Sequence, residues 1–140
     1  MPNRNLLQVL VVDDSEDSRH LISKLLRDAG YTVVLSSSAE RALGIIEDNK
    51  QIGIVITDMM MPGIGGRGLI EKLREAKSRP KILIISGIKK LHEIVDLLDG
   101  GAEYFLPKPI DRKMLITYVE RMNLAYEDRA SAEKLSGASL

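Results

Sequence analysis

The feature that most constrains the fold of this chain is a regular alternation of short apolar runs with stretches of helical periodicity. The apolar runs are rich in Val, Ile and Leu, which is typical of strands buried on both faces of a sheet. They predict strands at residues 7–12, 32–35, 52–57, 81–85 and 103–106. The intervening stretches predict helices at residues 16–29, 39–47, 69–76, 91–98 and 112–123. Five strands alternating with five helices indicate one α/β domain with a mostly parallel sheet.

The boundaries of the first helix are marked by local signals. Ser15 is a suitable N-cap, and Glu16 and Asp17 in the first turn favour the helix dipole. Gly30 is a suitable stop. The inward face of this helix is expected to consist of Leu21, Ile22, Leu25, Leu26 and Ala29.

Polar residues follow the predicted strands at the edge where a parallel sheet binds its ligands. In open sheets of this class, ligands lie outside the carboxyl ends of the strands. The residues at this edge are Asp13, Asp14, Ser36, Asp58, Ser86 and the segment 107–109, which contains Lys108. We therefore expect three carboxylates, the hydroxyl of Ser86 and the ammonium group of Lys108 to meet although they lie far apart in the sequence.

The three carboxylates, those of Asp13, Asp14 and Asp58, would repel one another unless a cation lies between them. Mg²⁺ prefers oxygen ligands and is usually held by one or two protein carboxylates with waters or phosphate oxygens. Aspartate forms covalent phospho-intermediates, and phosphoryl transfer depends mainly on positioning and charge neutralisation. With Lys108 and Ser86 beside them, the carboxylates predict a site for phosphoryl transfer to an aspartate.

The composition excludes several other kinds of site. The chain has no cysteine and two histidines, so disulfides, thiolate zinc sites and multi-histidine metal sites are not expected. The 20 basic and 20 acidic residues balance, which leaves no positive excess for nucleic acid or an anionic membrane. The apolar run at residues 6–12 is too short to span a membrane, and no cleavage site follows it. We therefore expect a cytoplasmic protein without membrane association.

Four segments resemble the receiver domain of two-component response regulators. They are VLVVDDSEDSR at 9–19, VITDMMMPGIGG at 55–66, KILIISG at 81–87 and GAEYFLPKP at 101–109. They occur in the order of that family, and the similarity extends from residue 6 to residue 123. The resemblance implies the flavodoxin-like, doubly wound (βα)5 fold, with five parallel strands in the order 2-1-3-4-5. The fifth strand is then an edge strand, where Pro107 is tolerated.

The resemblance also implies roles for individual residues. Asp58 would accept the phosphoryl group, and Lys108 would pair with Asp58 or with the phosphoryl oxygens. Mg²⁺, or Mn²⁺ in its place, would be bound by Asp58, by Asp14 and by the backbone carbonyl of Met60. Asp13 would bind the same ion directly or through water.

A second set of residues would act as the switch. Ser86 occupies the Ser/Thr switch position of the family. Phe105, three residues before Lys108, occupies the aromatic switch position, and Tyr104 is the alternative register. The bond between Lys108 and Pro109 resembles one that is cis in the family, and a cis bond is cheapest before proline.

The function implied by the resemblance is a signalling switch rather than an enzyme. A sensor histidine kinase or a histidine phosphotransfer protein would donate the phosphoryl group to Asp58. The phosphorylated chain would then control a downstream protein or a fused output domain. The resemblance leaves open a phosphorylation-linked homodimer formed through the last helix–strand–helix face, and it implies no direct contact with nucleic acid.

Residues 1–126 are expected to form the receiver domain. Residues 127–140 are small and polar and are expected to be a tail, a helix extension or a linker remnant, and the pattern favours a partly disordered terminus. No output domain is expected after residue 126, so the chain is either a stand-alone receiver or a piece of a larger regulator.

Some residues depart from the family pattern. Gly63, Gly65 and Gly68 form a loop and a helix start that should be weak, because glycine costs about 1 kcal/mol relative to alanine inside a helix. Met60 and Ile88 are apolar where a side chain could approach attacking water. We therefore expect slow self-dephosphorylation.

Two alternative functions remain compatible with the alternating pattern. A Mg²⁺-dependent phosphatase with an aspartyl nucleophile usually has two aspartates separated by one residue after the first strand, whereas Asp13 and Asp14 are adjacent. An FMN-binding module would need a phosphate loop and aromatic residues to flank the flavin. The chain has one Phe, four Tyr and no Trp.

Overall fold

The structure is a computed structural model of the chain. It describes residues 7–76 and 79–138, with side chains up to residue 125. The parts of the expected domain and tail at residues 1–6, 77–78 and 139–140 lie outside the described residues.

Five strands form one parallel sheet. They are β1 (Gln8–Val12), β2 (Thr32–Ser36), β3 (Ile52–Asp58), β4 (Lys81–Ser86) and β5 (Tyr104–Pro107). The order across the sheet is β2-β1-β3-β4-β5, and each neighbouring pair is parallel. The predicted (βα)5 fold and strand order are confirmed. Pro107 lies on the edge strand β5, where its missing N–H interrupts no interior ladder.

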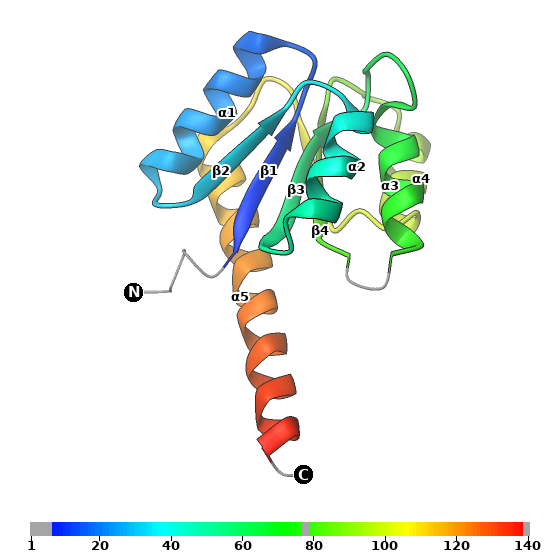
Figure 1. Cartoon of the computed structure of the whole chain (residues 1–140). Coiled ribbons are helices and arrows are strands. Elements are labelled where there is room, and N and C mark those ends of the chain that lie inside the picture. Colours follow the sequence, from blue (N-terminus) through cyan, green and yellow to red (C-terminus); the bar gives the residue numbers. More distant parts are fainter. Residues whose placement is uncertain (1–6, 77–78, 139–140) are drawn as a thin grey trace.

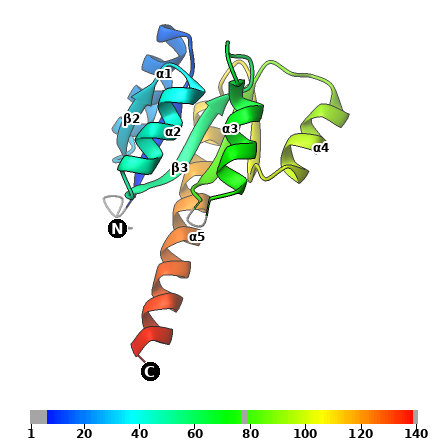
Figure 2. The same cartoon turned by 45° about the vertical axis from the view of Figure 1, so that its right-hand side comes forward.

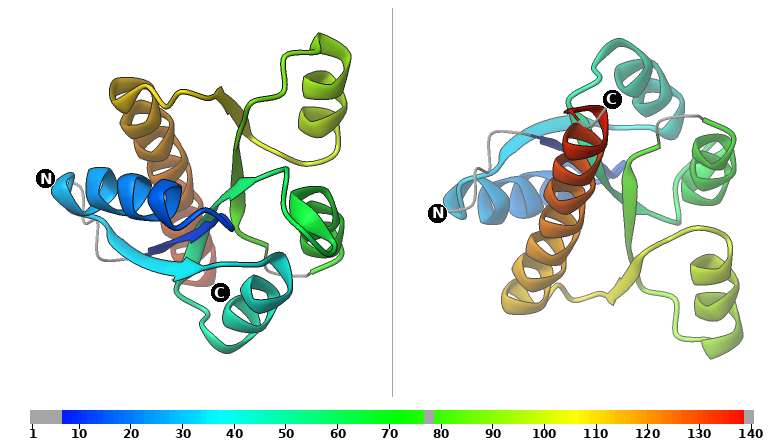
Figure 3. Two further views of the ribbon diagram at one scale, coloured as in Figure 1. Left: turned by 90° about the horizontal axis from the view of Figure 1, so that it is seen from above. Right: turned by 90° about the horizontal axis from the view of Figure 1, so that it is seen from below.

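Helices cover both faces of the sheet, as Figures 1 and 3 show. They are α1 (Glu16–Asp28), α2 (Ala39–Asp48), α3 (Gly65–Arg74), α4 (Leu91–Asp99) and α5 (Arg112–Ala138). α1 and α5 lie on one face, and α2, α3 and α4 lie on the other (Figure 3). The apolar side chains accordingly form two clusters, one on each side of the sheet.

The alternation of side chains along each strand separates these clusters. On β1, Val9 and Val11 pack with residues of α1 and α5, whereas Leu10 and Val12 pack with residues of α2 and α3. Each strand therefore contributes to two cores, which explains why its sequence is continuously apolar. The carboxyl edge of the sheet holds the polar residues of the candidate site.

The first helix has the expected ends but one outward residue. Ser15 caps α1, and its side chain accepts a hydrogen bond from the backbone N–H of Ser18. Gly30 follows with a φ of 95°, a conformation that favours glycine. The expectation that Leu21 faces inward is wrong, because its side chain is 49% exposed. The buried face of α1 is centred instead on Ile22 and Leu26.

The third helix begins four residues earlier than its sequence predicts. The expected start is residue 69, whereas α3 begins at Gly65. The backbone N–H of Gly66 donates to the carbonyl of Met59 at 3.3 Å, so the first turn is held against the end of β3. Tertiary contact here overrides the low helix propensity of glycine.

The last helix is longer than expected. α5 continues past residue 123 to Ala138, so a helix extension, and not the favoured disordered terminus, is found at 127–138. The sequence of this part contains Ala, Glu, Lys, Leu and Arg, which are good helix formers. Figures 1 and 2 show that the extension projects from the domain at the end opposite to the carboxyl edge of the sheet.

Among the helices that the structure describes, none is long and apolar enough to cross a membrane.

Candidate functional site

The three predicted carboxylates meet at the carboxyl edge of the sheet. Asp58 is the last residue of β3 and Asp13 follows β1, and these neighbouring strands pair with Val12 opposite Thr57. The register therefore places Asp13 beside Asp58. One carboxylate oxygen from each of Asp13, Asp14 and Asp58 lies within 4.8 Å of the others. The predicted acidic cluster is thus present as a group that could hold a metal ion.

Lys108 reaches this cluster from the end of β5. Its Nζ lies 2.7 Å from Oδ2 of Asp58 and 3.6 Å from Oδ2 of Asp13. The backbone N–H of Lys108 donates to the carbonyl of Ser86 at 3.0 Å, which ties the lysine to the end of β4. The peptide bond between Lys108 and Pro109 is cis, as expected.

Burial and charge set the electrostatics of the cluster. Asp13 and Asp58 are buried, whereas Asp14 is exposed. Burial raises the pKa of Asp13, and the neighbouring carboxylates of Asp58 and Asp14 raise it further, against the hydrogen bond from Ser15 and the charge of Lys108. Although burial lowers the pKa of Lys108, its hydrogen bond to Asp58 and the charge of Asp13 raise that pKa overall. The lysine is therefore a fixed positive charge at neutral pH.

Asp13 is held so that one of its oxygens makes no hydrogen bond, although Nζ of Lys108 lies 3.6 Å from it. Oδ1 of Asp13 accepts a hydrogen bond from the backbone N–H of Ser15 at 2.9 Å. The carbonyl of Asp13 accepts from Nη1 of Arg19 at 2.7 Å. Oδ2 is buried without a hydrogen-bond partner among the described residues. A buried carboxylate oxygen with no donor is where a cation fits, so these residues suit a hard divalent ion such as Mg²⁺.

Both oxygens of Asp58 have partners. Oδ2 accepts from Lys108, and Oδ1 accepts from the backbone N–H of Met60 at 3.0 Å. Asp58 is 8% exposed and lies at the carboxyl edge of the sheet. Met60 itself is 72% exposed, so its side chain stands at the mouth of the site.

The predicted switch residues lie on neighbouring strands. Ser86 ends β4 and is fully buried, and its Oγ accepts from the backbone N–H of Ile88 at 3.3 Å. Phe105 on β5 is half-buried and packs with the cluster that also contacts Ile88. Tyr104 points to the opposite face, where its ring stacks on Tyr118 with centroids 4.5 Å apart. The alternation along β5 thus brings Phe105, not Tyr104, to the side of Ile88.

Sequence reasoning assigned no role to Arg19 or Glu40. Arg19 lies six residues after Asp13, and its side chain donates to the carbonyl of Asp13. A short loop followed by one turn of α1 spans this distance, so the spacing could have suggested the contact. Glu40 contacts the backbone of Ile64, which is 24 residues away in the chain. No local pattern predicts that second contact.

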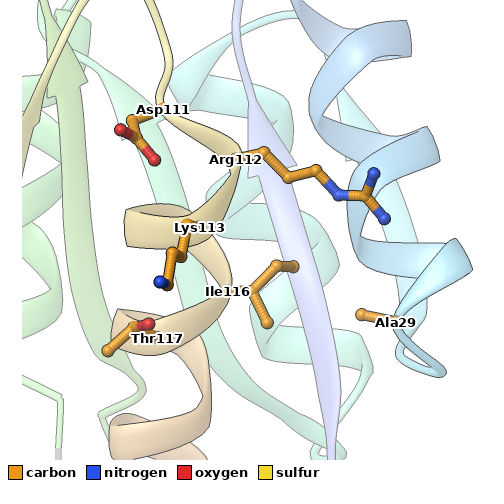
Figure 4. A pocket seen from close by; sticks show the side chains of 6 residues that line it. All are labelled: Ala29, Asp111, Arg112, Lys113, Ile116 and Thr117. Atoms are coloured by element: carbon orange, nitrogen blue, oxygen red, sulfur yellow. The ribbon is translucent and has the colours of Figure 1, made fainter.

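A groove of about 680 Å³ lies between the end of α1 and the start of α5 (Figure 4). Its lining residues are Ala29, Asp111, Arg112, Lys113, Ile116 and Thr117. Asp111 is engaged in capping α5, because its Oδ1 accepts from the backbone N–H of Met114 at 3.0 Å. The groove contains none of the residues that converge at the carboxyl edge.

Comparison with protein families and curated proteins gives consistent matches. The model of the response regulator receiver domain matches residues 9–120. The transcriptional regulatory protein YrkP of Bacillus subtilis is 31% identical over 130 residues, which cover 90% of this chain and 55% of YrkP. The two-component response regulator-like protein APRR7 of Arabidopsis thaliana is 36% identical over 112 residues, which cover 78% of this chain and 15% of APRR7. The chain thus spans about half or less of the length of these relatives.

Solved structures show the same fold. The response regulator receiver domain protein of Clostridium thermocellum is 27% identical with a TM-score of 0.81, and the match covers 87% of this chain and 98% of that one. The chemotaxis protein CheY4 of Vibrio cholerae, crystallised at low pH, is 26% identical with a TM-score of 0.77. That match covers 84% of this chain and 98% of CheY4.

Proposed function

The chain belongs to the response regulator receiver domain family, and from this premise we propose that Asp58 accepts a phosphoryl group and thereby switches the conformation of the domain. The observation that supports this most is the convergence of Asp13, Asp14, Asp58 and Lys108 at one edge of the sheet. A nucleophilic carboxylate, further carboxylates for a metal and a fixed cation are the groups that phosphoryl transfer needs.

The proposed donor is a phosphohistidine on a sensor kinase or on a phosphotransfer protein. A carboxylate oxygen of Asp58 attacks the phosphorus, and the P–N bond breaks. The electron pair of that bond stays on the imidazole nitrogen, which takes up a proton as the histidine leaves. Lys108 neutralises charge that builds on the phosphoryl oxygens, since its ammonium group already lies 2.7 Å from Asp58.

We propose that Asp13, Asp14 and Asp58 hold Mg²⁺ or Mn²⁺ with the backbone carbonyl of Met60. The ion would supply neutralisation of the negative charge shared by the carboxylates and the phosphoryl oxygens. The buried Oδ2 of Asp13, which makes no hydrogen bond among the described residues, and the mutual distances of the carboxylates support this assignment. Ser15 and Arg19 keep Asp13 in place through their hydrogen bonds to its side chain and carbonyl.

The proposed switch begins with the new charge on Asp58. A phosphoryl group brings roughly −1.5 to −2 charges and three acceptor oxygens, by analogy with phosphorylated hydroxyls. The hydroxyl of Ser86 turns from the backbone of Ile88 to donate to one of these oxygens. The loop after β4 then moves, and Phe105 turns into the space that it leaves. This is a shift of population between two packings.

The wider setting belongs to the same proposal. Residues 1–126 act as the receiver domain, and the helical extension within 127–140 links it to a partner or to an output domain. The output is read by protein contact, in the cytoplasm, without direct binding of nucleic acid by this domain. The domain catalyses no turnover of an external substrate beyond assisting its own phosphorylation and dephosphorylation.

The test is phosphorylation by a small donor. The chain is incubated with acetyl phosphate and Mg²⁺, and intact mass spectrometry measures the gain of one phosphoryl group. We expect the gain in the wild type, its loss in Asp58→Asn and its retention in Asp48→Asn, which changes an exposed aspartate on α2. A gain that survives Asp58→Asn, or steady release of phosphate without accumulation of the modified chain, would overturn the proposal.

A further inference from the structure

The loop between β3 and α3, residues 59–64, is held by a carboxylate from a different helix. Glu40 lies in the first turn of α2, and its Oε1 accepts a hydrogen bond from the backbone N–H of Ile64 at 2.8 Å. Ile64 is the N-cap residue of α3, which has no side-chain cap and no acidic residue in its first turn. Glu40 thus supplies from α2 the acceptor that a helix start usually receives from its own sequence.

The loop is shaped to meet this carboxylate. Gly63 has a φ of +80°, in the region that favours glycine, and a Cβ built at this position would overlap Oε1 of Glu40. The close approach of loop and carboxylate therefore depends on glycine at position 63. The hydrogen bond from Ile64 also lowers the pKa of Glu40, so the acceptor stays ionised at neutral pH.

Both ends of the same loop are attached to the phosphorylation site. At the start, the backbone N–H of Met60 donates to Oδ1 of Asp58 at 3.0 Å. Just past its end, in the first turn of α3, a Cβ built on Gly66 would overlap the carbonyl oxygen of Asp58, so this turn lies close against that backbone. A change in the middle of the loop will therefore be felt by Asp58 and by the carbonyl of Met60.

We infer that Glu40 is a positioning residue for the Mg²⁺ and phosphorylation site, acting through the backbone of the 59–64 loop. The inference rests on the proposed function, which makes the carbonyl of Met60 a metal ligand. With the loop pinned at Ile64, that carbonyl is already in place when the ion arrives. Without the hydrogen bond from Ile64 to Glu40, the loop would adopt other conformations in part of the population. The apparent affinity for Mg²⁺ would then be reduced in proportion to the fraction of chains that is competent to bind.

Three variants separate this role from a simple effect of charge. Glu40→Ala removes the acceptor and the charge, whereas Glu40→Gln removes the charge and keeps an acceptor oxygen. Glu47→Ala is the matched control, because Glu47 is an exposed glutamate on the same helix. Mg²⁺ dissociation constants are measured from amide NMR shifts, together with hydrogen exchange of the Ile64 and Met60 amides and the thermal midpoint.

We expect Glu40→Ala to raise the Mg²⁺ dissociation constant at least about threefold. Mutation of residues that orient metal ligands commonly lowers metal affinity by more than this. The Ile64 amide should exchange faster in the same variant. Glu40→Gln should lie closer to the wild type, and Glu47→Ala should match it. Should Glu40→Ala fail to fold, Glu40→Asp replaces it, because the shorter side chain withdraws the carboxylate from Ile64.

Two results from the variants would overturn the inference. Equal weakening by Glu40→Ala and Glu40→Gln would mean that only the charge matters. A lower thermal midpoint in Glu40→Ala with an unchanged Mg²⁺ dissociation constant would reduce Glu40 to a structural cap. A wild-type chain that binds Mg²⁺ but takes no phosphoryl group would count against the proposed function alone, whereas one without Mg²⁺ affinity would overturn both.

Discussion

The ammonium group of Lys108 lies 2.7 Å from Oδ2 of Asp58, although 50 residues separate the two in the chain. The pair joins the ends of β3 and β5 across β4. It lies at the same edge of the sheet as Asp13 and Asp14. Asp58 is almost fully buried, whereas the side chain of Lys108 is 31% exposed. Solvent therefore screens part of the attraction from one side.

This pair leads to a prediction about stability without metal. Lys108→Met should destabilise the fold by about 1–3 kcal/mol, less than the loss of a fully buried pair because Lys108 is partly exposed. The cost arises because Asp58 is left buried without its cation. In an Asp58→Asn background, the same lysine substitution should cost less than half as much. Denaturant unfolding of the four chains of this cycle, with exposed Lys113→Met as the control, gives the coupling. Equal costs in both backgrounds would rule out a stabilising pair.

Acidification should weaken the binding of Mg²⁺. Burial raises the pKa of Asp13 above its ordinary value of 3.8, so protons compete with the ion at a higher pH than they would for a free aspartate. The same shift means that Asp13 stabilises the metal-free fold at low pH, and this contribution is lost as the pH rises through the raised pKa. Titration calorimetry across the acidic range should therefore show the Mg²⁺ dissociation constant rising as the pH falls.

Asp13→Asn tests the origin of that pH dependence. Removing the carboxylate should weaken Mg²⁺ binding by about tenfold or more and flatten its dependence on pH. Asp17→Asn is the control, because this substitution removes the same charge from a nearby residue. Asp17 is exposed and lies in the first turn of α1. If both variants bind Mg²⁺ alike, Asp13 is not a ligand.

The contrast between two glycines predicts opposite changes in stability. A Cβ on Gly66 would overlap the carbonyl oxygen of Asp58 and lie 2.9 Å from Cα of Met59. Gly66→Ala should therefore destabilise the fold by about 1–3 kcal/mol, the usual cost of overpacking. A Cβ on Gly44, within α2, would meet nothing within 4 Å. Gly44→Ala should stabilise by about 0.5–1 kcal/mol, and urea unfolding compares the two. A neutral Gly66→Ala would show that the start of α3 does not press on β3.

The fold was predictable because its signals are local. Continuous apolar runs, the cap at Ser15 and the stop at Gly30 each depend on neighbouring residues, so the elements and their order followed from the sequence. The meeting of Asp13 with Asp58 was predictable as well, because parallel strands end at one edge. What the pattern could not predict depends on contacts between distant segments.

The early start of α3 and the role suggested for Glu40 belong to that second kind. Glycines at 65 and 66 weaken a helix when they are judged alone, yet the close approach to the backbone of Asp58 requires a residue without a Cβ. The contact from Glu40 to Ile64 joins two helices that no motif connects. Leu21 was misplaced because a five-residue apolar stripe is wider than the surface that α5 and the sheet cover on α1.

The extension of α5 should be dispensable for the chemistry of the site. It projects from the end of the domain opposite to the carboxyl ends of the strands (Figures 1 and 2), so its removal leaves the carboxyl edge intact. A chain that ends at residue 126 should take up phosphate from acetyl phosphate at the wild-type rate. It should lose helical circular dichroism in proportion to the residues removed. A large fall in the phosphorylation rate would show that the extension belongs to the domain.

The apolar side chains at the mouth of the site should make the phosphorylated state long-lived. Met60 is 72% exposed and Ile88 is half-buried, and neither can orient a water molecule for attack on the phosphorus. The double variant Met60→Asn with Ile88→Glu introduces groups that can hold such a water. Its phosphate should be lost roughly tenfold faster, a modest share of what positioned polar groups contribute to proton transfer.

Decay of the phosphorylated mass after removal of the donor measures this rate. Met114→Asn is the control, because Met114 is an exposed methionine on α5 and is not one of the residues of the acidic cluster. Its decay should match that of the wild type, which separates access of water at the site from a general effect of adding a polar side chain to the surface. If the double variant also decays at the wild-type rate, the prediction is wrong, and the lifetime of the phosphorylated state is set by groups that both chains share. Lys108 is the first of these groups to examine, because its ammonium group would hold the phosphoryl oxygens in either chain.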